Sequence, residues 1–213
     1  MSVDLKICGL STPAAVNAAV IGHAKYIGFV FFESSPRAVT PNIMANLCLS
    51  VPKNIKKVGL FVDASIETIA SAVSTGSLDM IQLHGSESPS MLSEIKSKFG
   101  LPVMKAIPIA CKEDLATAKT YENYADMLLF DSKPPSSATR PGGNALSFDW
   151  SLIAGQNWRL PWMLAGGINM ENLALAVEIS GATAIDVSSG VEDLEGFKSP
   201  VKIKELLYFA ATL

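Results

Sequence analysis

Reactive and polar side chains occur two residues apart in three short apolar stretches of this sequence. The three pairs are Lys6 with Cys8, Gln82 with His84, and Asp186 with Ser188. Residues two apart lie on the same face of a β-strand, and a strand covered on both sides is normally apolar on each of them. Polar pairs in such strands therefore indicate a site in which several functional groups meet.

Two of the candidate residues could supply acid–base chemistry. A lysine next to Cys8 should favour the thiolate, lowering a thiol pKa that starts at about 8.5, and a thiolate can act as a general base or nucleophile. Asp131 ends the apolar run "MLLFD" and could act as a general acid. The alternatives are a buried, inert Cys8, an Asp131 that only caps local amides, and a structural His84.

The elements that must position these residues alternate between strand and helix. Eight short aliphatic runs read as strands, at 4–8, 26–32, 56–62, 79–84, 102–107, 126–131, 161–166 and 183–189. Helical patterns lie between them. Those at 12–24 and 40–50 begin with Thr-Pro, a capping residue followed by proline at the first helical position, and the pattern at 88–100 begins with Ser88 and ends at Gly100.

Eight such βα units in 213 residues predict a single α/β domain over residues 1–213, a (β/α)₈ TIM barrel. An open doubly wound sheet is the alternative, but the sequence lacks its G-x-G-x-x-G turn after a strand. In a barrel the active site lies at the C-terminal ends of the strands, where the three polar pairs, Arg37 and Asp131 would all be found. The long loop 132–147 after the sixth strand is predicted to be a functional lid.

Composition excludes several classes of partner. The net charge of −3 and the pI near 5.4 provide no basic surface for nucleic acid. No apolar run approaches the roughly 20 residues of a membrane span. Three cysteines without metal-like spacing, and no signal-peptide pattern before the first strand, indicate a cytoplasmic protein that binds no metal. Both a monomer and a homodimer are compatible with the sequence.

Two glycine-bearing turns predict a phosphate site. "LAGGIN" follows the seventh predicted strand and "VSSGVE" the eighth, where barrels of this kind bind phosphate through backbone N–H groups and the start of a short extra helix. The candidate residues in these turns are Gly166, Gly167, Ser188, Ser189 and Gly190. The alternative is a pair of ordinary tight βα turns.

A series of motifs then resembles one family along the whole chain. The motifs are "KICGL" (6–10), "GFVFFESSPRAVTP" (28–41), "VGLFV" (58–62), "IQLHGSE" (81–87), "LLFDS" (128–132), "PGGNALSFDW" (141–150), "LAGGIN" (164–169) and "DVSSGVE" (186–192). In this order they resemble phosphoribosylanthranilate isomerase, a family of tryptophan biosynthesis that performs an Amadori rearrangement. No single motif is specific, but the combination is.

The resemblance implies roles for individual residues. Cys8 matches the general base, Asp131 the general acid, and Arg37 the residue that meets the anthranilate end of the substrate. Further substrate contacts are expected from Lys6, Gln82, His84 and Asp186. The implied phosphate site contains Gly142, Gly143, Gly166, Gly167, Ser188, Ser189 and Gly190. The implied partner is a small phosphosugar, and no cofactor is implied.

The implied reaction needs one acid and one base on opposite sides of a sugar. Protonation of the furanose ring oxygen opens the ring to an iminium ion, and removal of the C2 proton gives an enolamine. One alternative is another phosphosugar isomerase barrel, such as the histidine-pathway enzyme with two aspartates, against which Cys8 argues. The other is a non-catalytic barrel that binds a phosphorylated metabolite, which would predict loss of Cys8 or Asp131. The fold alone cannot separate them.

Overall fold

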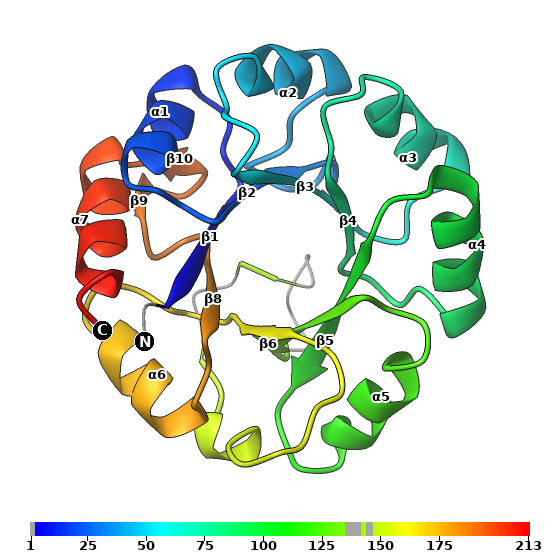
Figure 1. The fold of residues 1–213 in the computed structure, drawn as a ribbon, viewed down its shortest axis with the longest axis vertical. Coiled ribbons are helices and arrows are strands. Elements are labelled where there is room, and N and C mark those ends of the chain that lie inside the picture. The colour runs from blue at the N-terminus through cyan, green and yellow to red at the C-terminus, as the bar shows by residue number, and fades with distance from the viewer. Residues whose placement is uncertain (1–2, 135–141, 144–146) are drawn as a thin grey trace.

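The computed structural model describes residues 3–134, 142–143 and 147–213, and in these residues eight parallel strands form a closed barrel. Figure 1 shows the strands at the centre and the helices around them. The barrel strands are β1 (Asp4–Cys8), β2 (Tyr26–Val30), β3 (Lys56–Phe61), β4 (Met80–Leu83), β5 (Val103–Ile109), β6 (Met127–Ser132), β7 (Trp162–Leu164) and β8 (Ala184–Val187). The predicted TIM barrel is therefore confirmed.

The outer layer consists of the helices α1 (Pro13–Ile21), α2 (Pro41–Cys48), α3 (Ile66–Val73), α4 (Pro89–Phe99), α5 (Asp114–Tyr121), α6 (Leu173–Ser180) and α7 (Pro200–Ala210). Of these, α1 to α6 connect successive barrel strands, and α7 follows the last one. The three predicted helix starts are confirmed, since the side chains of Thr12, Thr40 and Ser88 each accept a hydrogen bond from a backbone N–H in the first turn. Gly100 ends α4 in the left-handed conformation that glycine adopts without strain.

The alternation of side chains along the strands separates two packed layers. The outward-facing residues Leu5, Ile7, Leu83 and Val187 belong to the large core that the helices cover. A second, smaller cluster fills the barrel interior and includes Met104, Leu129 and Met163. Lys6 and Cys8 alternate with Leu5 and Ile7, so their side chains point into the barrel.

Two connections differ from a plain βα repeat. Among its described residues the sixth connection contains only the short 3₁₀ helix η1 (Trp150–Leu152), and the predicted lid falls partly on 135–141 and 144–146, outside the described residues. After β8 the chain forms an antiparallel pair, β9 (Glu192–Leu194) and β10 (Phe197–Lys198), in place of the extra helix that the phosphate turn was expected to begin. Strands of three and two residues are too short to give a recognisable pattern.

No helix in the described part of the chain has both the length and the apolar character needed to cross a membrane.

The helix–sheet layer makes a testable contribution to stability. Leu92 in α4 is fully buried, whereas Leu49 just after α2 is 85% exposed. We expect Leu92→Ala to lower the free energy of unfolding by about 2–5 kcal/mol, because it opens a cavity in the core. Leu49→Ala, the matched control, should change it by less than about 0.5 kcal/mol. Urea unfolding followed by circular dichroism measures both, and equal effects would contradict this description of the core.

Candidate active site

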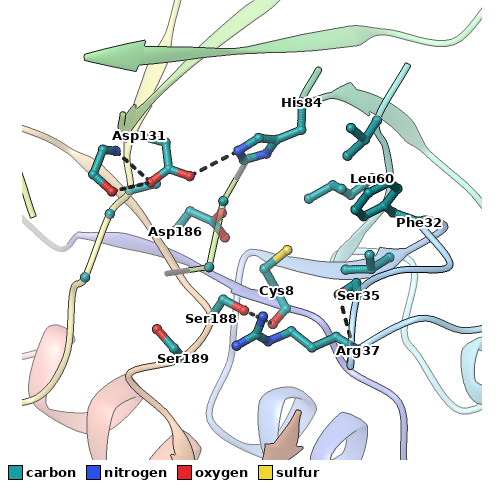
Figure 2. A pocket seen from close by; sticks show the side chains of 18 of the residues that line it. Cys8, Phe32, Ser35, Arg37, Leu60, His84, Asp131, Asp186, Ser188 and Ser189 are labelled. Carbon is teal, nitrogen blue, oxygen red and sulfur yellow. Dashed lines mark hydrogen bonds and ion pairs between the residues drawn. The ribbon is translucent and has the colours of Figure 1, made fainter. Parts of the chain in front are cut away.

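A cavity opens at the C-terminal ends of the barrel strands, and most of the predicted residues line it (Figure 2). The lining residues that the sequence predicted are Cys8, Arg37, His84, Asp131, Gly142, Gly143, Gly166, Gly167, Asp186, Ser188 and Ser189. Lys6, Gln82 and Gly190 are not among the residues that line it. The expectation that Lys6 and Gln82 look into the barrel mouth is therefore wrong. Both side chains point into the barrel, but they are fully buried below the cavity.

A buried ion pair lies beneath Cys8. The Lys6 Nζ donates to Asp186 Oδ1 at 2.9 Å, and the two residues are register partners in the ladder between β1 and β8. Gly28 on the neighbouring strand makes room for this group, since a Cβ there would lie 2.9 Å from Cys8 Sγ and 3.2 Å from Lys6 Nζ. The thiol, the ammonium and the carboxylate thus share the barrel interior where β1, β2 and β8 meet.

The electrostatics of Cys8 differ from the sequence-based expectation. Burial raises the pKa of the Cys8 thiol, and the Asp186 charge raises it further; Lys6 and Lys198 lower it without offsetting these effects. Burial alone would lower the pKa of Lys6, but Asp186 and Cys8 outweigh it and hold that pKa above its ordinary value. The expectation that Lys6 gives Cys8 a lowered pKa is therefore wrong, because burial raises this pKa by more than the Lys6 charge lowers it.

Asp131 lies across the cavity at the end of a hydrogen-bonded chain (Figure 2). Its Oδ1 accepts from the backbone N–H of Ser132 at 2.8 Å, and its Oδ2 lies 3.1 Å from His84 Nε2. The other ring nitrogen, Nδ1, is 2.9 Å from Gln82 Nε2. With Gln82 as the donor, Nδ1 accepts and the Nε2–H of a neutral His84 points at Asp131. Gln82 therefore acts on the site through His84.

The glycine turns meet at the ends of β7 and β8. Asn169 and Gly190 form a parallel bridge, and a Cβ at Gly190 would lie only 2.0 Å from the carbonyl oxygen of Ile168. Gly166 has a φ of +90°, and a Cβ there would lie 2.8 Å from the backbone nitrogen of Ser132. Glycine is thus required for the close approach of these turns, and Gly166 and Gly167 line the same cavity as Ser188 and Ser189.

The other two predicted phosphate residues lie in a different part of the cavity. A Cβ at Gly142 would lie 2.7 Å from His84 Nε2 and 2.9 Å from Asp131 Oδ2. A Cβ at Gly143 would lie 2.7 Å from Arg37 Nη1. Gly142 and Gly143 therefore pack on the acid–base and guanidinium groups, whereas the residues after β7 and β8 form their own cluster.

Sequence reasoning missed two kinds of site residue. One is an apolar wall, formed by Val30, Phe32, Leu60 and Val62 from the ends of β2 and β3. The run "GFVFF" carried a signal for it, since its inward positions continue to the strand end. The other is a charged pair that lies behind Arg37. This pair consists of Glu192 and Lys198, and nothing in the local sequence pattern singles it out.

The site combines a thiol, a carboxyl group, a buried guanidinium, an apolar wall and glycine turns suited to an anion. No group of three or more His, Cys, Asp or Glu side chains that could hold a metal ion occurs in the described residues. The arrangement can protonate one side of a small phosphorylated ligand and accept a proton on the other.

Comparisons with known proteins agree with this geometry. The model of the N-(5'-phosphoribosyl)anthranilate isomerase family matches residues 5–208. A relative of that name from Rhodospirillum centenum is 49% identical over 214 residues and covers 100% of both chains. One from Parvibaculum lavamentivorans is 51% identical over 209 residues and covers 97% of each.

Solved structures give the same result. Phosphoribosyl anthranilate isomerase from Thermotoga maritima superposes with a TM-score of 0.88 at 32% identity, covering 99% of this chain and 100% of that one. A phosphoribosyl anthranilate isomerase in complex with reduced 1-(o-carboxyphenylamino)-1-deoxyribulose 5-phosphate superposes with a TM-score of 0.85 at 31% identity, covering 99% and 100%. The family match, the relatives and the barrel-mouth site together show that this chain belongs to the N-(5'-phosphoribosyl)anthranilate isomerase family.

Proposed function

We propose that the protein catalyses the Amadori rearrangement of N-(5'-phosphoribosyl)anthranilate to 1-(2-carboxyphenylamino)-1-deoxyribulose 5-phosphate, in tryptophan biosynthesis. The observation that carries this proposal is that a thiol from β1 and a carboxyl group from β6 line one cavity. Their strands are three positions apart around the closed barrel, counted through β8 and β7. The two groups can therefore flank a single sugar.

Asp131 is the general acid in this proposal. It delivers a proton to the furanose oxygen, the C1–O bond breaks, and the nitrogen lone pair forms the iminium ion. The Oδ1 atom accepts the Ser132 N–H and the Oδ2 atom accepts from His84 Nε2, so both oxygens of the carboxyl group are held in place. His84 and Gln82 then fix the orientation of the carboxyl group.

Cys8 is the general base that removes the C2 proton to give the enolamine. Its raised pKa means that the thiolate is the minor form near neutral pH, but a desolvated thiolate is a correspondingly stronger base. Proton transfer of this kind contributes about 10²- to 10⁴-fold to a rate. The enolamine then tautomerises to the ketose without any redox partner.

Binding is divided among three parts of the cavity. The turns after β7 and β8, with Gly166, Gly167, Ser188, Ser189 and Gly190, receive the phosphate. Arg37 receives the anthranilate carboxylate, and the apolar wall that includes Phe32 packs on its ring. Two fully buried residues, Lys6 and Gln82, support these contacts from below the cavity, and three further lining residues complete its wall: Asp186, Gly142 and Gly143.

Two further expectations from the sequence stay predictions. The partner is a small phosphosugar, and the protein is cytoplasmic. Monomer and homodimer both stay open; one related structure, 31% identical, is described as monomers generated from a dimeric isomerase of Thermotoga maritima.

The first test is turnover of freshly made phosphoribosylanthranilate, followed by the loss of its fluorescence. We expect Cys8→Ser and Asp131→Asn each to lower kcat by about 10²- to 10⁴-fold, since each removes one proton-transfer group. Cys111→Ser and Asp193→Asn, at exposed positions, are the matched controls and should retain activity. An inert wild type would favour the binding-only barrel, and active variants at both sites would refute the acid–base assignment.

The second test is the titration of Cys8 in a Cys48→Ala, Cys111→Ala background, where it is the only thiol. We expect thiolate absorbance to appear with a midpoint above the ordinary thiol value of about 8.5, because burial raises the pKa of Cys8. The folded state then holds this proton more tightly than the unfolded state, so the contribution of Cys8 to stability is lost as the pH rises between the two pKa values.

The control for this titration is the same protein in urea, where the midpoint should return to the ordinary thiol value. A folded-state midpoint below that of the unfolded protein would show that the charge of Lys6 outweighs burial, as the sequence alone suggested.

A further inference from the structure

The guanidinium of Arg37 is held by a carboxylate from the other end of the chain. Its Nε donates to Glu192 Oε1 at 2.7 Å and its Nη2 donates to Glu192 Oε2 at 2.9 Å. Both side chains are almost fully buried, at 4% and 5% exposure. Two parallel charge-assisted hydrogen bonds of this kind fix both the position and the plane of a guanidinium.

The rest of Arg37 is confined by two glycines. A Cβ at Gly9 would lie 2.7 Å from Arg37 Cδ, so the stem of the side chain packs on the backbone that follows β1. The Nη1 atom, which Glu192 does not contact, faces Gly143 on the cavity side. Arg37 therefore enters the cavity in one orientation, with its Nε and Nη2 atoms turned toward Glu192.

Glu192 is itself fixed by the β9–β10 hairpin. The backbone N–H of Gly196 donates to its Oε2 at 3.1 Å, and Lys198 Nζ contacts its Oε1. Lys198 also donates to Ser188 Oγ at 3.3 Å, which ties the hairpin to the end of β8. A Cβ at Gly196 would lie 2.8 Å from the carbonyl oxygen of Pro36, so the hairpin packs directly on the loop that carries Arg37.

We propose that Glu192 is the positioning residue of Arg37, and that the β9–β10 hairpin keeps the guanidinium ready for the carboxylate of the substrate. The inference rests on the proposed function, in which Arg37 meets the anthranilate end. An unrestrained arginine would lose side-chain freedom when the ligand binds, and a prepositioned one has already lost it. Glu192 thus acts through Arg37 and does not touch the substrate.

The charge of Glu192 distinguishes a role in positioning Arg37 from a role in setting the charge of the cavity. Burial alone would raise the pKa of Glu192, but hydrogen bonds and charges from Arg37 and Lys198 lower it to about 2, so it is anionic at any working pH. An anion beside the cavity opposes the binding of an anionic substrate by simple electrostatics. A role in positioning and a role in setting charge therefore predict opposite changes in affinity when the charge is removed.

The experiment compares Glu192→Gln with wild type. Glutamine keeps the size of the side chain but has only one oxygen acceptor, so the two-bond contact with Arg37 is lost. We expect KM to rise about tenfold with kcat within about twofold, the signature of lost binding that is uniform along the reaction. The Kd for the reduced product analogue named above, measured by calorimetry, should rise by the same factor.

The matched control is Asp193→Asn on the same hairpin, whose exposed carboxylate pairs with Lys202 and not with Arg37. It should leave KM and Kd unchanged. Glu192→Asp, which keeps the charge but shortens the reach, should also raise KM, and it replaces Glu192→Gln if circular dichroism shows that variant to be unfolded. An unchanged or lowered KM for Glu192→Gln would overturn the inference in favour of a charge effect.

A double-mutant cycle separates positioning from general support of the fold. In an Arg37→Ala background, Glu192→Gln should raise Kd by a much smaller factor, because the contact with Arg37 is gone and only the contact through Lys198 to Ser188 remains. If Glu192→Gln raised Kd by the same factor in the wild-type and the Arg37→Ala backgrounds, the inference would be overturned. If the wild type binds the analogue but shows no turnover, the proposed function fails while the Kd comparison still decides the role of Glu192.

Discussion

The site depends on the buried ion pair that joins the first and last strands of the barrel. Lys6 and Asp186 face each other across the β1–β8 ladder, with side chains that are 0% and 8% exposed. Each charge is costly to bury alone, and removal of one partner from such a pair typically costs about 3–5 kcal/mol. The pair therefore joins β1 and β8 directly beneath Cys8, and its two charges act on the pKa of that thiol in opposite directions, since Lys6 lowers it and Asp186 raises it.

The two walls of the cavity hold their reacting groups in different ways. On the β1 side, charged groups neutralise one another and leave the thiol as the reactive atom. On the β4 and β6 side, a chain of polar groups runs from Gln82 through His84 to Asp131 without a fixed cation. A paired environment suits a group that must accept a proton, and an oriented hydrogen-bond chain suits one that must deliver it. The barrel keeps both on rigid strand ends, so the distance between acid and base does not depend on a loop.

What could be predicted from the sequence was local, and what could not was long-range. Strand and helix positions followed from side-chain period and from caps such as Thr12 and Ser88, which act within one turn. The depth of Lys6 and Gln82 below the cavity did not follow from such local signals, because it depends on how the strands stagger around the barrel. The sign of the Cys8 pKa shift required its burial, and the role of Glu192 required a contact with a residue 155 positions earlier.

Gly28 has a further consequence for how such a barrel can change during evolution. Because position 28 carries no side chain, the space beside residue 8 is controlled from strand β2 as well as from β1. The Cys8 thiol and the Lys6 ammonium already fill this space, so a side chain at position 28 would displace one of them. A change on β2 can therefore alter the reacting group of β1 without any change at residue 8 itself.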